Sequence, residues 1–178
     1  MNFNSDKGIL LRRYATVLLL AMWMGGFTFY ALIVIPTATK VLGSIRLAGF
    51  ITQQVTNWLN LIGVAVILFF LWNVTAEWNQ QTRVRRMCLA GMWGVMALTH
   101  SWLFIVHRFI DHQLKIPSHT IGDYDGFLTL HTVYLFIATT QWVAALIYLW
   151  LLFGCWRRSD MEERVSLRVP DEMARVGG

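Results

Sequence analysis

Charged residues are scarce in this chain, and its long apolar stretches almost lack them. Asp, Glu, Lys and Arg make up 14% of the 178 residues, whereas about 25% is usual for a soluble domain. Four runs reach the roughly 20 apolar residues that a helix needs to cross the hydrocarbon core, and only Arg108 interrupts one of them, near its end. The nine Trp residues suit the membrane–water boundary, where the ring is buried and its N–H stays wet. The sequence therefore predicts an integral membrane protein.

Catalytic signatures are missing as well. The chain contains no HExxH, Walker loop, nucleophile elbow, Rossmann glycine pattern or kinase motif, so we expect no enzymatic activity. Its two cysteines, Cys88 and Cys155, have no zinc-site spacing, and their predicted cytoplasmic position does not favour a disulfide. The net charge of +5 comes from Lys and Arg at the ends of apolar runs, with no basic patch interleaved with aromatic residues. Nucleic acid is therefore not an expected partner.

The apolar runs predict an all-α fold: a membrane-spanning antiparallel four-helix bundle, with the second helix extended beyond the bilayer on the outer side. The four expected spans are residues 14–35, 55–76, 87–110 and 128–153. They form a transmembrane domain of residues 14–156, between a cytoplasmic N-terminal segment of residues 1–13 and a cytoplasmic tail of residues 157–178.

Local signals predict where these helices begin and end. Ser44 is a candidate N-cap followed by apolar residues at helical spacing, so the second helix is expected to start there. Pro36 is expected to end or kink the first helix, or to be absorbed by it. In the tail, Ser159 opens a capping box and predicts a short surface helix to about Arg168. The end of the chain from Pro170 onward is expected to be disordered.

Lys and Arg are distributed unevenly between the two sides of the predicted bundle. Eleven belong to the N-terminal segment, the second loop and the tail, and four lie on the opposite side. Because cytoplasmic segments carry the excess of Lys and Arg, both termini are predicted to be cytoplasmic. We expect a bacterial inner membrane as the location. The expected partners are the lipid bilayer and either other membrane proteins or further copies of this chain.

Histidines mark the third and fourth runs. His100, His107 and Asp111 are seven and four residues apart, so they share one face of the third helix. His131 lies about one turn inside the outer end of the fourth helix, and the rise per residue places it at the depth of His107. These four residues are candidate ligands for zinc, copper or haem b. The alternative is that each histidine makes a structural hydrogen bond across helices, with no cofactor.

Other residues in the runs carry a functional and a packing interpretation. Small residues let transmembrane helices approach closely, which predicts helix packing at Gly25, Gly26, Gly63, Gly91 and Gly94. Thr139, Thr140 and Gln141 are expected to form interhelical hydrogen bonds or to line a solute path.

Two further sets of side chains could hold a metal. Met87, Met92 and Met96 suit either core packing or copper(I). Either Asp123 or Asp125 is expected to cap the fourth helix, although a pair of loop aspartates can also bind a cation.

Short motifs resemble a family of small four-helix membrane proteins of unknown function, whose eukaryotic members are associated with platinum-drug resistance. They are Trp23, Gly25-Gly26, Phe29, Pro36, Leu42, Gly49-Phe50-Ile51 and the aromatic-x3-His pattern Phe127–His131. The resemblance implies the four-helix fold and no established mechanism. Helix content and the use of His and Met are also similar to copper-resistance membrane proteins. The sequence favours a non-enzymatic accessory or structural membrane protein, and the alternative is a metal- or haem-binding membrane protein.

Overall fold

The computed structural model describes residues 3–76, 78, 81–115, 120–121 and 123–176. Its helices are α1 (Phe3–Phe29), the π-helical turn η1 (Tyr30–Val34), α2 (Ile35–Leu42), α3 (Ile45–Ala76), α4 (Arg83–Gln113) and α5 (Tyr124–Val176). Within the described residues, four helical segments are long and apolar enough to cross a membrane: Lys7–Leu42, Leu47–Ala76, Arg83–Gln113 and Asp125–Glu162. Each contains one of the spans expected from the sequence, so the four-helix, all-α prediction is confirmed.

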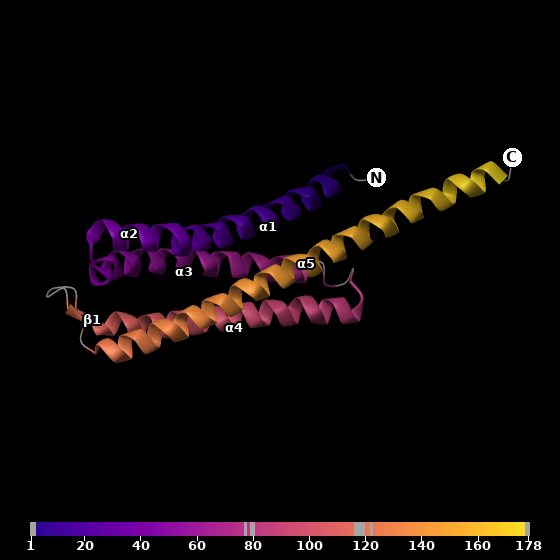
Figure 1. The fold of residues 1–178 in the computed structure, drawn as a ribbon. Coiled ribbons are helices and arrows are strands. Elements are labelled where there is room, and N and C mark those ends of the chain that lie inside the picture. Colours follow the sequence, from indigo (N-terminus) through magenta and orange to yellow (C-terminus); the bar gives the residue numbers. More distant parts are fainter. Residues whose placement is uncertain (1–2, 77, 79–80, 116–119, 122, 177–178) are drawn as a thin grey trace.

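The helices run antiparallel along one another (Figure 1). The start of α1, the end of α3 and the start of α4 lie at one end of the bundle, and the α2–α3 turn and β1 lie at the other. α4 packs against α3 and α5, and α1 packs against α3. Two short strands follow α4: β1 (Leu114–Lys115) pairs antiparallel with β2 (Thr120–Ile121). This pair of strands was not expected from the sequence.

The first helical segment continues through Pro36. Proline has no backbone N–H, and its ring clashes with the carbonyl of the residue four positions earlier, here Leu32. The π-helical turn η1 widens the backbone immediately before Pro36 and absorbs this defect. The segment ends at Gly43, whose φ of 62° is the left-handed conformation typical of a helix C-terminus.

The start of α3 follows the sequence prediction. The Ser44 Oγ accepts a hydrogen bond from the Leu47 backbone N–H at 3.3 Å, as an N-cap does. The helix has 32 residues, which is about 48 Å at 1.5 Å per residue. That exceeds a hydrocarbon core of about 30 Å, so this helix extends beyond the bilayer.

The tail differs from the expectation. Ser159 does not cap a new helix, because its Oγ donates to the carbonyl of Cys155 at 3.2 Å inside the continuous α5. α5 then runs past Pro170 to Val176, where a disordered end was expected, and projects beyond the bundle (Figure 1). Extending a helix that is already formed fixes one residue per hydrogen bond gained, whereas a new helix needs a costly nucleus.

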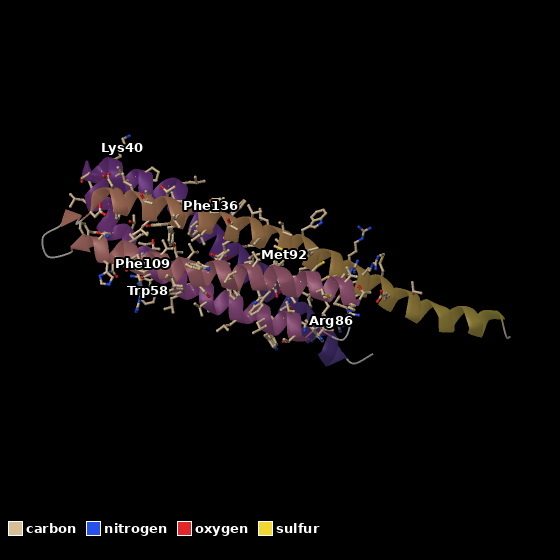
Figure 2. The ribbon with its side chains drawn as sticks, turned by 90° about the horizontal axis from the view of Figure 1, so that it is seen from below. Lys40, Trp58, Arg86, Met92, Phe109 and Phe136 are labelled. Atoms are coloured by element: carbon tan, nitrogen blue, oxygen red, sulfur yellow. The ribbon has the colours of Figure 1, made fainter. Side chains whose placement is uncertain are left out.

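The interior consists of two apolar clusters with polar side chains between them. One cluster centres on Phe70, Met96 and Tyr148, all fully buried. The other contains Leu103 and Ala138. The outside of the bundle is apolar as well: Figure 2 shows aromatic side chains on its surface at Trp58, Phe109 and Phe136, which are 65%, 57% and 74% exposed. Such an exterior suits lipid and not water.

Candidate functional site

His100 on α4 is the centre of the buried polar layer. Its Nε2 lies 2.9 Å from the backbone carbonyl oxygen of Asn60 on α3. Its Nδ1 lies 3.0 Å from the amide nitrogen of Gln141 on α5. The Gln141 amide donates to Nδ1, so the ring proton on Nε2 donates to the Asn60 carbonyl. With one ring proton on Nε2 and a lone pair on Nδ1, both ring nitrogens form hydrogen bonds, and His100 joins α3, α4 and α5.

The space for the His100 ring is provided by Gly63 on α3. A Cβ at Gly63 would lie 2.9 Å from both His100 Nε2 and Trp23 Nε1, and it would overlap the His100 Cε1. Trp23 meets the His100 ring edge-on at a centroid distance of 5.8 Å, and Phe104 does so at 5.4 Å. The ring is therefore enclosed by α1, α3 and its own helix.

Asn60 extends this network and leaves one group unused. The Tyr134 hydroxyl on α5 donates to the Asn60 Oδ1 at 3.3 Å. Asn60 is 3% exposed, and its Nδ2 has no hydrogen-bond partner among the described residues. A buried amide without a partner is costly in a low-dielectric interior.

A small cavity of about 20 Å³, enough for about one water molecule, adjoins this layer. All four helical segments contribute to its wall, which is mostly apolar. The lining residues are Trp23, Met24, Phe27, Leu59, Asn60, His100, Leu103, Ala138, Gln141 and Trp142.

A second polar pair lies farther along α4. His107 Nε2 is 3.7 Å from Asp111 Oδ1, and both atoms are buried without a hydrogen-bond partner among the described residues. The His107 ring also forms a hydrogen bond with the backbone of Gln53 on α3. Two metal–ligand bonds of about 2.1 Å each could span the 3.7 Å gap, so this pair could hold part of a cation site.

The four predicted metal ligands are not brought together. No three of the described His, Cys, Asp and Glu residues are grouped in a way that could hold a metal ion. His131 is exposed, and its ring stacks on Phe127 of its own helix at 6.1 Å. It is Tyr134 whose ring faces His107, at 6.0 Å. The rise per residue predicts depth along a helix, but it does not predict how the helix is rotated about its axis.

The glycines predicted to allow helix packing differ in their surroundings. Gly63 is in the close contact described above, and Gly26 has the Leu59 Cδ2 at an ordinary 3.8 Å. At Gly25, Gly91 and Gly94 a Cβ would meet no described atom within 4 Å. No described atom packs closely on these three positions, so helix packing at them stays a prediction.

Of the three polar residues singled out near the middle of α5, only one bonds to another helix. Gln141 makes the predicted interhelical hydrogen bond, to His100. Thr139 and Thr140 are exposed and donate to carbonyls of their own helix, at 2.8 and 2.9 Å, so the interhelical hydrogen bonds predicted for them were wrong. At the start of α5, Asp123 is the cap: its Oδ1 accepts from the Gly126 N–H at 3.1 Å.

The methionines of α4 do not present one common surface, since Met87 is 63% exposed and Met96 is fully buried.

Sequence reasoning missed Asn60. Its amide side chain, inside the apolar run of residues 55–76, was the available signal, because a polar group within the membrane must find partners inside the bundle. Comparisons of the chain with protein-family models, curated proteins and solved structures found no match. The resemblance described above therefore stays a prediction, and the site is interpreted from its own geometry.

Proposed function

We propose that this chain is a non-enzymatic integral membrane protein with an accessory or structural role, held in one packing arrangement by the His100 layer. The observation that carries this proposal is that both ring nitrogens of His100 are used in hydrogen bonds to other helices. To act as a haem or metal ligand, His100 would have to give up the bond to Asn60 or the bond to Gln141. The layer suits a structural role better than a ligand role.

The proposed topology places both termini in the cytoplasm. The Lys and Arg excess supports this orientation. The beginning of α1 and the departing part of α5 meet at one end of the bundle, where Arg13 Nη1 lies 2.7 Å from Asp160 Oδ1. The Arg13 guanidinium also lies over the Trp156 ring, 5.4 Å from its centroid. This cluster suits a membrane–water boundary, where Trp and Arg are both stable.

The experiment is a comparison of wild type with His100→Ala, both purified in detergent. We expect wild type to be colourless, without stoichiometric metal, and more resistant to thermal unfolding than the variant. Thr99→Ala, one residue away and bonded only to its own helix, is the matched control and should unfold as wild type does. A Soret band, or bound metal that His100→Ala removes, would overturn the proposal.

A second candidate function is cation binding by His107 and Asp111. The two facing atoms without partners favour it, although a complete site needs further ligands from a substrate, a solvent molecule or another chain. Titration with Zn²⁺ and Cu²⁺ should show binding that His107→Ala and Asp111→Asn abolish. His131→Ala is the control, and because His131 is exposed and its ring stacks on Phe127, it should bind as wild type does. Equal affinity in all four proteins rejects this candidate.

A further inference from the structure

The first turn of α4 carries three arginines, Arg83, Arg85 and Arg86, and no acidic residue. A helix begins with backbone N–H groups that have no intrahelical partner, and its macrodipole places partial positive charge at the same point. Cations are therefore disfavoured there, and three of them in one turn also repel one another. An anion beside this turn would be attracted by the arginines and by the helix N-terminus together.

The charge of this turn is not neutralised by its neighbours. None of the three arginines forms an ion pair with a residue that the structure describes. The sequence from Glu77 to Arg86 contains three Arg against one Glu, a net charge of +2. Lys40 differs, because it lies in the last turn of α2, where the dipole favours a cation. The start of α4 is thus a place where the local charge calls for an anion.

Arg86 is held in position for such a contact. Its Nη1 donates to the Trp78 carbonyl at 3.3 Å, and its guanidinium carbon lies 4.8 Å from the centroid of the Trp78 ring. Arginine has five N–H donors in a planar fork that matches phosphate oxygens, so Arg86 keeps donors for a ligand. Figure 2 shows Arg86 at the end of the bundle from which α5 projects. Trp78 is 41% exposed there, and tryptophan suits the membrane–water boundary.

Two amide side chains beside Arg86 also lack partners. Asn73 and Gln81 line the same small cavity as Arg86 and Trp78. Asn73 is 1% exposed, and neither its amide atoms nor the Gln81 Nε2 has a hydrogen-bond partner in the part of the chain that the structure describes. The cavity itself, of about 10 Å³, is too small for a phosphate group. A phosphate would therefore lie outside it, on the first turn of α4, with Gln81 as a further donor.

From these observations we propose that the first turn of α4 binds the phosphate group of an anionic phospholipid. The phosphate oxygens accept hydrogen bonds from Arg83 and Arg86, from the backbone N–H groups at the start of α4, and from Gln81. The acyl chains lie along the apolar outside of the bundle. A headgroup that carries its own cation is disfavoured, because the arginines repel it. The proposal goes beyond the accessory role given above, and it does not depend on which side of the membrane this end faces.

The test is native mass spectrometry of the full-length protein in detergent, with equal amounts of phosphatidylglycerol and phosphatidylcholine added. Both lipids have a phosphate, but choline neutralises the second. We expect wild type to bind phosphatidylglycerol in preference. Arg83→Gln/Arg86→Gln should lower the ratio of bound phosphatidylglycerol to phosphatidylcholine about fivefold, the equivalent of two charged contacts at a surface. Inorganic phosphate in large excess should not displace phosphatidylglycerol, because it has no acyl chains.

Two double variants with the same change in net charge are the controls. Lys40→Gln/Arg108→Gln removes two exposed charges near the opposite end of the bundle. Arg157→Gln/Arg158→Gln removes two exposed charges from α5 where it leaves the bundle. Both should keep the lipid ratio of wild type, because the first turn of α4 is intact in each.

Four outcomes overturn the proposal: equal binding of the two lipids by wild type, an unchanged ratio in Arg83→Gln/Arg86→Gln, the same loss of preference in Arg157→Gln/Arg158→Gln, or displacement of the lipid by inorganic phosphate. The third would mean that any positive charge at this end attracts anionic lipid, and the fourth that the turn binds phosphate without a lipid. Circular dichroism checks the folding of each variant. If Arg83→Gln/Arg86→Gln does not fold, Arg83→Gln/Arg85→Gln decides the result, because it keeps the contact of Arg86 with Trp78.

Discussion

A methyl group added at Gly63 should test how the centre of the bundle is packed. The Cβ of Gly63→Ala would overlap the His100 ring and lie 2.9 Å from Trp23 Nε1, which is closer than Cβ atoms come to their neighbours. Relieving such overpacking costs about 1–3 kcal/mol. Displacing His100 would also weaken its bond to the Asn60 carbonyl, worth about 0.5–1.5 kcal/mol. Replacing Gly by Ala inside a helix returns up to about 1 kcal/mol.

The expected net loss is therefore about 1–3 kcal/mol in the free energy of unfolding. It can be measured by thermal or denaturant unfolding of the purified protein in one detergent, followed by circular dichroism. Gly91→Ala is the matched control, because no described atom lies within 4 Å of the added methyl group. It should be neutral, or more stable than wild type by up to about 1 kcal/mol.

A double-mutant cycle shows whether His100 is the cause of that loss. In the His100→Ala background the methyl group at Gly63 has room, so the added cost of Gly63→Ala should fall to that of the Trp23 contact alone. Contacting residues commonly couple by about 0.5–3 kcal/mol. Additive effects of the two substitutions, or equal stabilities of Gly63→Ala and Gly91→Ala, would refute the described packing of α3 on α4.

Three further substitutions have smaller expected effects, each read from unfolding under the same conditions. Asn73→Leu should stabilise the protein by about 1 kcal/mol, because Asn73 is 1% exposed and both its amide atoms lack a partner among the described residues; a loss of stability would mean that the amide is in use. Arg13→Ala should cost about 0.5 kcal/mol at low salt and less at high salt, because its Asp160 partner is half exposed; an effect that does not depend on salt contradicts an ion pair. Thr139→Val should change stability by less than about 0.5 kcal/mol, because its hydroxyl bonds only its own helix; a larger loss would reveal an interhelical role.

The spans could be predicted because lipid acts on the composition of consecutive residues. Each expected span lies inside one of the candidate membrane helices. Helix ends were less predictable, since apolarity marks where lipid is and not where backbone hydrogen bonding stops. Thus α1 begins at Phe3, before the expected first span of residues 14–35, and α5 passes Ser159, where a new helix was expected to start.

The residue types of the candidate site could be predicted from the sequence, but which residues contact each other could not. His100 and Gln141 were both singled out, but their contact depends on the rotation of α4 and α5 about their own axes. The same rotation turns Tyr134, and not His131, toward His107. The Asn60 side-chain amide could have been singled out from the sequence, but the main-chain carbonyl that accepts from His100 carries no signal there.

The polar layer also accounts for how one alignment of the helices is selected. In lipid, apolar helix faces gain little by preferring one another over the acyl chains, so the two apolar clusters do not by themselves fix the alignment of α3 against α4. His100 does so, because its ring fits only where Gly63 leaves room and its Nε2 reaches the Asn60 carbonyl one turn away. Sliding α4 by one turn along α3, about 5.4 Å, would break that hydrogen bond and bury the His100 ring nitrogens among apolar side chains. A buried polar group used in this way selects one arrangement more than it adds stability, which is why His100→Ala is expected to loosen the packing of α3, α4 and α5 as well as to lower the unfolding temperature.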